Sequence, residues 1–283
     1  MNRGLSSVEK MCSLLRLSRS GYYRWTKRKE KTFILNSIVE KVEKVFEQSK
    51  RSYGSPRIKH ELQSLGVEVS QSSVARAMKT LGLVARPRRK YIHTTESEHR
   101  YKVADNLLNR NFVASQINEK WVSDITYIRT QKGWVYLTVI LDLADRMVVS
   151  WNVSEDLSCE NTVMKTYKIA LLRRRINKPL IFHSDRGVQY CSINFRRILN
   201  KNPLVSQSMS RKGNCWDNAV AESFFKTLKV EWVKKHKYQN IDRVRKSIFD
   251  YIERWYNTKR KHSANSFLSP AQKHVLLNNR NVA

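Results

Sequence analysis

The strongest constraint on the fold is a change of hydrophobic periodicity near residue 119. Before it, apolar residues recur at helical spacing. After it come three runs rich in Val, Ile, Thr, Tyr and Trp, at residues 121–129, 134–142 and 146–153. Short polar turns separate these runs, which predicts three consecutive antiparallel strands. The chain is therefore expected to have an all-α part followed by a part built on a sheet.

Helices and strands alternate after the three predicted strands. We expect a helix over about 159–174, a strand at 180–184, a helix near 195–199 and a strand at 204–207, and a long helix that starts at Asp217 or Asn218 and ends near Lys235. Elements in this order are typical of a mixed α/β domain.

The first 92 residues contain only helical signals. Two short helices are expected around the turn Ser18–Gly21, followed by a helix at 33–48. Ser55-Pro56 and Ser70 are the expected starts of two more helices, which end near Gly66 and Gly82. Short helices with tight turns are typical of a helix-turn-helix module whose third helix enters a major groove. Plain helical bundles share this pattern, and only the charge of the chain favours DNA.

The chain is strongly basic. Its 54 Lys and Arg against 24 Asp and Glu give a formal net charge of +30. Such a charge favours a nucleic acid partner, because each cation placed on a phosphate releases condensed counterions. A hydrophobic content of 41% excludes a disordered basic tail. The charge is spread along the chain, whereas a membrane-surface protein concentrates it on one amphipathic helix.

Two further features of the composition bear on the cell compartment. The four cysteines lie far apart without a C-x-x-C pair, so we expect reduced thiols and no structural zinc site. No stretch approaches the length of a membrane span, and the first residues lack the apolar run of a secretion signal. We expect a protein that is cytoplasmic and, if bacterial, associated with the nucleoid.

Three carboxylates stand where predicted strands end or a helix begins. Asp124 lies in the first strand, Asp185 closes the fourth, and Glu222 lies in the first turns of the long helix. A single buried Asp is more often bonded to a backbone amide than to a metal. Three carboxylates without a His or Cys cluster nevertheless suit a hard ion such as Mg²⁺ or Mn²⁺. Two such ions about 4 Å apart can stabilise both oxygens of a phosphoryl displacement.

Other charged residues near these positions need separate interpretations. Lys226 and Lys229 follow Glu222 at helical spacing, which places them on its face or makes them ordinary salt-bridge partners. Asp142 competes as a ligand, whereas Asp217 is expected to cap the long helix and Glu231 to point away from the Glu222 face. His183 is expected to pack against or orient its neighbours.

Several long motifs carry a resemblance to a known family. They are WVSDITYI at 121–128, HSDRGVQY at 183–190 and SMSRKGNCWDNAVAESFF at 208–225, together with SGYYRW at 20–25, YGSPRI at 53–58 and the late Tyr256-Asn257, Arg260-x-His262-Ser263 and Ser269-Pro270. In this order they resemble the OrfB-type transposases of the insertion-sequence-three family, almost from end to end.

The resemblance implies a fold and a metal site. The fold is a ribonuclease-H-like mixed sheet flanked by helices, similar to retroviral integrases, preceded by an all-α helix-turn-helix region. Asp124, Asp185 and Glu222 would form an Asp-Asp-Glu triad that binds two Mg²⁺ or Mn²⁺ ions, and Lys229 would contact the terminal DNA. Between Asp185 and Glu222 lie 36 residues, where the family usually has 35. The extra residue is expected in a loop at 200–203.

The resemblance also implies partners. The complete enzyme would be made by frameshifting from an upstream OrfA-type frame, and the protein would self-associate on DNA. Its substrates would be the terminal inverted repeats of the element and target DNA. We further expect DNA contacts from the third helix, the second helix, the loop before Glu222 and the long helix that carries Glu222, and backbone contacts from the basic C-terminal region. The first group comprises Arg57, Ser72, Ser73, Arg76, Lys79, Arg211, Lys212, Lys226 and Lys229, and the C-terminal group comprises Arg243, Arg245, Lys246, Lys259, Arg260 and Lys261.

The predicted organisation has five parts. They are an N-terminal helical segment (1–32), a helix-turn-helix-like domain (33–92), a linker (93–117), a catalytic core (118–236) and a basic helical C-terminal part (237–283). Residues 86–102, which open with basic side chains, are also expected to form a linker that follows a phosphate backbone. The expected function is transposition by metal-dependent cleavage and strand transfer. Two alternatives stay open: a non-enzymatic helix-turn-helix regulator, and a ribonuclease-H-like nuclease that cuts without joining.

Overall fold

The computed structural model describes residues 7–85 and 103–280, except for the side chains of 27–37, 215 and 280. The chain forms two compact units, Met1–Arg86 and Pro87–Ala283, which are described separately below. Residues 86–102, which include the first part of the predicted linker, lie outside the described residues.

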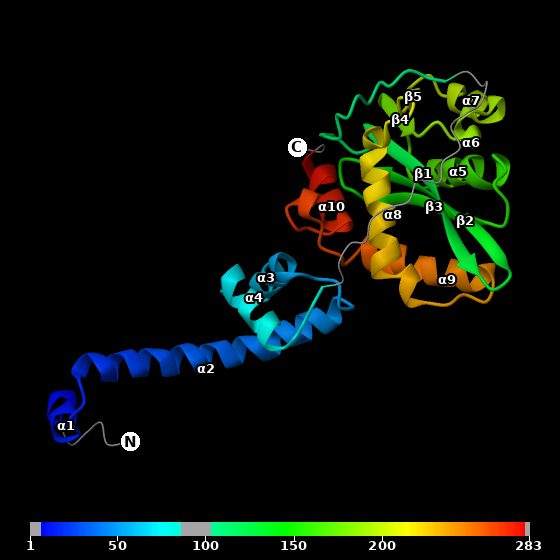
Figure 1. Cartoon of the computed structure of the whole chain (residues 1–283). Helices are drawn as coiled ribbons and strands as arrows, with labels where there is room; N and C mark the ends of the chain where they lie inside the picture. The colour runs from blue at the N-terminus through cyan, green and yellow to red at the C-terminus, as the bar shows by residue number, and fades with distance from the viewer. Residues whose placement is uncertain (1–6, 86–102, 281–283) are drawn as a thin grey trace. The chain divides into compact units, whose positions relative to one another are not determined.

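The first unit consists of helices. The described elements are α1 (Val8–Leu14), α2 (Arg19–Gln48), α3 (Ser55–Ser64) and α4 (Gln71–Thr80). The sequence predicted a break between 29 and 33, but α2 continues through it as one helix (Figure 1). This prediction was wrong because straight-chain residues such as Lys and Glu at 27–31 have high helix propensity and no Gly or Pro interrupts them.

Capped helix termini and a shared apolar core stabilise this unit. The Ser70 hydroxyl accepts a hydrogen bond from the Ser73 amide at 3.1 Å, so Ser70 caps α4 as predicted. Gly54, not Ser55, occupies the N-cap of α3, and Pro56 lies in its first turn. The core is formed by buried side chains from three helices, namely Val42, Val45, Phe46, Ile58, Leu62, Val74 and Met78.

The second unit is built on a five-stranded mixed sheet. Its strands are β1 (Lys120–Thr130), β2 (Gly133–Asp142), β3 (Val148–Ser154), β4 (Leu180–Ser184) and β5 (Val205–Met209). Their order is β3-β2-β1-β4-β5. β1, β2 and β3 form the predicted antiparallel meander, whereas β4 and β5 run parallel to β1.

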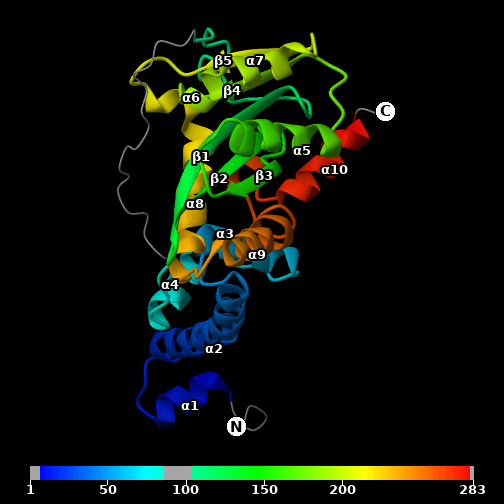
Figure 2. The same ribbon diagram turned by 90° about the vertical axis from the view of Figure 1, so that its right-hand side faces the viewer.

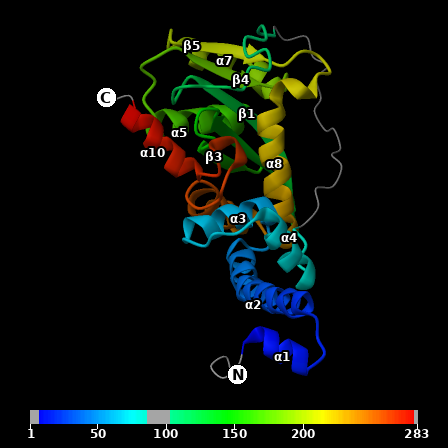
Figure 3. The same ribbon diagram turned by 90° about the vertical axis from the view of Figure 1, so that its left-hand side faces the viewer.

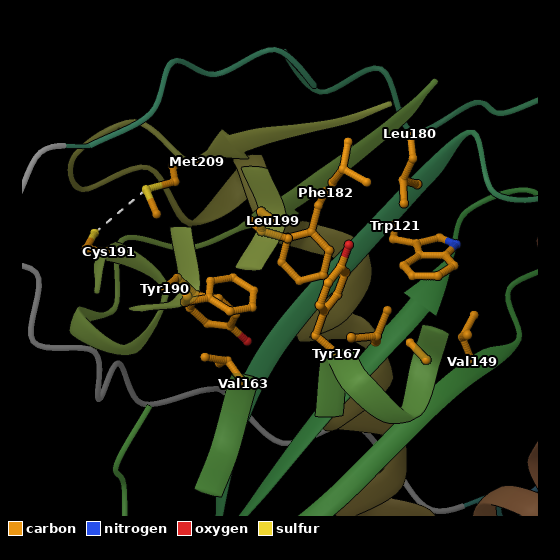
Figure 4. Packing of buried hydrophobic residues seen from close by; sticks show 14 residues of the cluster. Trp121, Val149, Val163, Tyr167, Leu180, Phe182, Tyr190, Cys191, Leu199 and Met209 are labelled. Carbon is orange, nitrogen blue, oxygen red and sulfur yellow. Dashed lines mark hydrogen bonds between the residues drawn. The ribbon is translucent and has the colours of Figure 1, made fainter. Parts of the chain in front are cut away.

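Helices cover both faces of the sheet. One face packs on η1 (Glu160–Met164), α5 (Lys165–Arg173), α6 (Val188–Cys191) and α7 (Ile193–Asn200), and the other carries α8 (Ala219–Glu231) (Figure 2). On the α5 side, Tyr167 meets Phe182 edge to face at 5.6 Å inside an aromatic cluster (Figure 4). The sequence predicted the strands and long helices, but not α6 or the π-helical turn η1. The core has the mixed, helix-flanked sheet expected from the sequence.

The C-terminal region packs on the same sheet. It contains η3 (Val233–Lys235), α9 (Ile241–Tyr251), η4 (Ile252–Tyr256), η5 (Ser263–Asn265) and α10 (Pro270–Arg280). Buried Arg174, the C-cap residue of α5, donates hydrogen bonds to Asp142 at 2.6 Å and Asp145 at 2.7 Å. His274 of α10 contacts the same Asp145 carboxylate at 2.7 Å, so α10 lies beside α5 (Figure 3). These contacts anchor α10 to the sheet.

Part of the predicted linker also packs on this unit. The amides of Leu107 and Leu108 donate to the Ser208 hydroxyl of β5 at 2.9 and 3.1 Å. The Leu108 side chain is buried. Residues 103–117 therefore behave as part of the second unit. None of the described helices is long and apolar enough to cross a membrane.

Candidate active site

The two predicted catalytic aspartates occupy matched positions on adjacent parallel strands. Val122 of β1 pairs with His183 of β4, and this is the last pair between the two strands. Asp124 and Asp185 each lie two residues further along the chain. Parallel, in-register strands therefore bring both carboxylates to one edge of the sheet, at the point where β1 and β4 stop pairing.

An open pocket of about 200 Å³ lies at this edge. Asp124, Asp185 and Glu222 line it, and Lys226 and Lys229 of α8 line it as well. The structure thus brings together the three predicted carboxylates and two predicted DNA-binding lysines. The remaining lining residues are Ile125, Thr126, Tyr127, Leu157, Gly187, Val188, Gln189, Tyr190 and Phe225.

Backbone amides hold the two aspartates. Oδ1 of Asp124 accepts a hydrogen bond from the Ile125 amide at 2.8 Å, and Oδ1 of Asp185 accepts one from the Gly187 amide at 2.9 Å. A Cβ at position 187 would lie only 3.1 Å from Oδ1 of Asp185. Glycine therefore lets the chain turn tightly around this carboxylate without pressing on it.

The pocket concentrates negative charge within a basic protein. Burial, and then the charges of Asp185 and Glu222, raise the pKa of Asp124 well above its usual value. Burial also lowers the pKa of Lys229, although the negative charge of Asp124 opposes this shift. Both shifts have the same cause, because a partly dry pocket penalises charge that is not balanced nearby. The site therefore favours the arrival of further positive charge.

The three carboxylates share a pocket but not a common coordination shell. Within residues 7–85 and 103–280, no three acidic, His or Cys side chains already stand in an arrangement that could hold a metal ion. Mutual repulsion between like charges favours such separation when no cation balances them. The donor set itself suits a hard ion, since the described lining residues include neither His nor Cys.

The start of α8 is fixed to the strand that carries Asp124. Before the helix, the short turn η2 (Cys215–Asn218) delivers the Asn218 side chain, whose amide donates to the Ser123 carbonyl at 3.2 Å. The Ser123 hydroxyl is hydrogen-bonded to the Tyr190 hydroxyl at 2.7 Å. Glu222 lies one turn further along the helix, so these contacts set its position relative to Asp124.

Asp217 does not cap the helix, and that prediction was wrong. The N-cap of α8 is Asn218, which makes no side-chain cap hydrogen bond. The buried Asp217 carboxylate instead accepts hydrogen bonds from Arg211 at 2.8 and 2.9 Å, from Arg110 at 2.8 Å and from Asn106 at 2.9 Å. Hydrogen bonds from Arg211 and then Arg110 hold the pKa of Asp217 well below its usual value. Arg211, a predicted DNA contact, thus braces the loop before α8.

Arg260 does not contribute to a basic surface as predicted. Its side chain is only 3% exposed and donates to both oxygens of Glu231, at 2.7 and 2.8 Å. The Tyr251 hydroxyl donates to the same carboxylate at 3.1 Å. Glu231 lies outside the pocket, as its helical spacing predicted. Charge counting misjudged Arg260 because a sequence gives the sign of a charge but not its burial.

The other competing residues also lie away from the pocket. Buried His183 makes hydrogen bonds with Ser208 at 2.8 Å and Ser210 at 3.2 Å, and burial lowers its pKa to about 4. The His183 ring is therefore neutral and holds β5 in position through its hydrogen bond with Ser208. Asp142 forms an ion pair with Arg174 and does not line the pocket.

The predicted DNA contacts of the first unit lie on one helix and its neighbour. Ser72, Arg76 and Lys79 of α4 are exposed, and the Ser73 hydroxyl is hydrogen-bonded to that of Ser70 at 2.9 Å. Arg57 of α3 lies over the Tyr53 ring, 5.7 Å from its centroid. In the second unit, Lys212 is exposed in the loop before α8.

The remaining nine lining residues had no individual role in the sequence analysis. Tyr127, Gln189 and Tyr190 belong to the quoted motifs and follow Asp124 or Asp185 by three to five positions. Their closeness in sequence to the two aspartates was the signal that could have identified them as site residues. No sequence signal indicated the Arg110–Asp217 and Arg260–Glu231 pairs, because the partners lie 107 and 29 residues apart.

Comparisons with known families cover both units. A model described as an integrase core domain matches residues 114–215, which include Asp124 and Asp185. A second integrase core domain model matches residues 204–270, which include Glu222. An HTH-like domain model matches residues 35–91.

Relatives match along nearly the whole chain. Transposase InsF for insertion sequence IS3A of Escherichia coli K12 is 38% identical over 281 residues, covering 98% of this chain and 96% of that protein. The 31 kDa protein of insertion element IS600 of Shigella sonnei is 40% identical over 266 residues, covering 92% and 96%. Among solved structures, the HTLV-2 integrase catalytic core domain in complex with magnesium is 18% identical, with a TM-score of 0.42, covering 56% of this chain and 97% of that one.

Proposed function

The chain belongs to the IS3 family of DNA transposases, and on this premise we propose that Asp124, Asp185 and Glu222 form its catalytic triad. The observation that carries the proposal is the meeting of these three carboxylates in one pocket. They come from β1, from the end of β4 and from α8, which are far apart in sequence.

The triad would hold two divalent ions, Mg²⁺ or Mn²⁺. All three side chains offer oxygen ligands, and repulsion among them is relieved when cations enter. Bound there, the ions would supply Lewis-acid stabilisation of the phosphodiester displacement. The amides of Ile125 and Gly187 would keep one oxygen of each aspartate in place.

The two lysines of α8 would bind the DNA backbone at the pocket. Lys226 and Lys229 line it on the same helix as Glu222. Burial removes water from around the Lys229 ammonium group. A DNA phosphate bound beside it would supply negative charge, which favours the protonated form of Lys229. Both lysines can therefore position a strand without taking part in bond breaking.

The reaction we propose has two displacements. Water attacks a phosphodiester at the end of the element and releases a 3′-hydroxyl. This hydroxyl then attacks a phosphodiester of the target DNA, so one strand is joined as another bond breaks. Neither step needs a covalent bond to the protein.

The first unit would supply part of the DNA recognition. Exposed Ser72, Arg76 and Lys79 give α4 the character of a recognition helix, with Ser73 and Arg57 beside them. Its substrate would be the terminal inverted repeats. We further propose, as the family resemblance implies, an upstream-frame OrfA-type segment as fusion or partner, self-association on DNA, and a bacterial cytoplasmic protein associated with the nucleoid.

A labelled-oligonucleotide assay tests the proposed function. The full chain, with the upstream-frame product in a parallel reaction, is incubated with Mg²⁺, a labelled element end and a target plasmid. We expect both nicked ends and labelled plasmid. Nicking without labelled plasmid would favour a nuclease. Binding without cleavage in both reactions would favour a non-enzymatic regulator.

A further inference from the structure

The hairpin of β1 and β2 carries an aromatic and basic face that no described helix covers. Tyr127 and Arg129 of β1 lie opposite Tyr136 and Trp134 of β2 in the antiparallel register. Successive residues of a strand alternate between faces, so these four side chains share one face. We call them the hairpin strip.

The strip begins where the helical cover of this face ends. Asn152 of β3 contacts the helical segment that covers this face, because its side chain donates to the Asn161 carbonyl at 2.6 Å. Asn152 pairs with Thr138, and the next residues of β2 on this face are Tyr136 and Trp134. At the far end, the Gln131 amide donates to the Tyr238 carbonyl at 2.9 Å, which holds the turn beside the start of α9 (Figure 1).

The side chains of the strip contact each other in a continuous row. The Tyr127 ring meets the Tyr136 ring edge to face at 5.3 Å and the Trp134 ring at 6.4 Å. The Arg129 guanidinium lies 5.2 Å from the centre of the Trp134 ring. Trp134 is nevertheless 51% exposed, although a tryptophan is among the side chains with most to gain from burial. Packing between the two strands explains why these side chains contact one another. It does not explain why the Trp134 ring stays exposed to solvent.

The strip is continuous with the catalytic pocket. Asp124 and Tyr127 point to opposite faces of β1, and the pocket reaches both faces, since it is lined by Glu222 of α8 and also by Tyr127 and Gln189 of α6. Tyr127 also starts the aromatic row. The charge of the hairpin suits a polyanion, since residues 125–138 contain Arg129 and Lys132 and no acidic residue. Asp156, which follows β3, is engaged by Ser158 and Asn161. A ligand that leaves the pocket along this face meets aromatic rings and cations.

We propose that the hairpin strip binds unpaired nucleotides of the DNA strand that leaves the catalytic pocket. The inference rests on the proposed function, which brings DNA to this pocket. Aromatic rings bind bases by stacking, and a base is available for stacking only when it has left the duplex. Arg129 and Lys132 add the cations that follow a phosphate backbone. Double-stranded DNA, whose bases are already paired, would contact only the cations Arg129 and Lys132.

Binding of short oligonucleotides tests the strip. The full chain carrying Asp124→Asn, which prevents cleavage, is titrated into fluorescein-labelled 12-mer oligothymidine and into a 12-bp duplex at near-physiological salt. Loss of one stacked base corresponds to roughly tenfold weaker binding. We therefore expect Trp134→Ala to weaken single-strand binding about tenfold and duplex binding less than twofold. Trp134→Phe should stay close to the parent.

The control is Phe249→Ala, an aromatic residue of α9 that is 43% exposed and lies outside the strip. It should leave both affinities unchanged. Thermal melting establishes that each variant is folded. An unchanged affinity of folded Trp134→Ala for oligothymidine would overturn the proposal, as would equal losses for the single strand and the duplex.

Photocrosslinking separates this proposal from general electrostatic binding. Oligothymidine with one 5-iodouracil is irradiated in complex with the protein, and the crosslinked peptides are sequenced. Crosslinks to residues 127–136 are expected, whereas crosslinks confined to other peptides would overturn the strip. Failure of the proposed function would appear differently, as an absence of cleavage by the wild-type protein whatever the oligonucleotide affinities.

Discussion

Replacing Asp124 by Asn is expected to lower cleavage and joining by on the order of 10³-fold, since losing a metal's stabilisation of the transition state costs several kcal/mol. The amide keeps the size of the side chain but removes its negative charge. Asn also removes repulsion with Asp185 and Glu222, so the melting temperature should not fall. The measurement is the rate of 3′-end formation on a labelled element end in Mg²⁺.

Binding to the element end distinguishes a catalytic defect from misfolding. Asp124→Asn should bind it as tightly as the wild type does. Asp242→Asn is the matched control, because Asp242 is an exposed carboxylate at the start of α9, paired only with Arg245 among the described ion pairs. It should cleave at the wild-type rate. Wild-type activity of Asp124→Asn would remove Asp124 from the triad.

Breaking the Arg260–Glu231 pair is expected to give the largest loss of stability. Glu231→Leu would leave the guanidinium of Arg260 almost fully buried without its counter-charge. Removing one partner of a buried pair typically costs about 3–5 kcal/mol. We expect a loss of that size in the free energy of unfolding from urea denaturation. Because Glu231 ends α8, cleavage should also decrease as the helix of Glu222 and Lys229 loosens.

The double variant Glu231→Leu, Arg260→Met is the control for this argument. A buried ion pair replaced by apolar residues of similar volume is often neutral or stabilising. The double variant should therefore recover most of the lost stability. If Glu231→Leu alone were as stable as the wild type, the pair would not anchor α8, and the buried charge would have to be compensated elsewhere.

Much of the catalytic unit follows from local pattern. Runs rich in Val, Ile, Thr, Tyr and Trp, separated by short polar turns, predicted β1, β2 and β3, because these side chains favour the extended backbone. The place of Asp185 at the end of an apolar strand was also readable. The meeting of Asp124 with Asp185 was not, because it depends on the parallel pairing of Val122 with His183, and no local signal gives the partner of a strand.

What the sequence missed is mostly the burial of charge. Arg260 was expected on DNA, yet it is buried and paired with Glu231. Arg211 is half exposed and paired with Asp217, and its contact with DNA stays a prediction. Asp217 looked like a helix cap because it precedes an apolar run, but its carboxylate is satisfied by Arg110 and Arg211 instead. A sequence lists donors and acceptors, whereas their pairing across long separations is decided by tertiary packing. The hairpin strip was missed for the same reason.

The most direct test of the central claim is to count bound metal ions. Electron paramagnetic resonance of Mn²⁺ reports how many ions are bound by the full chain in complex with an element end. The wild type should bind two ions per chain in excess of the DNA alone. Asp124→Asn, Asp185→Asn and Glu222→Gln should each bind fewer, and the triple variant none. A triple variant that still binds as many ions as the wild type would contradict the account.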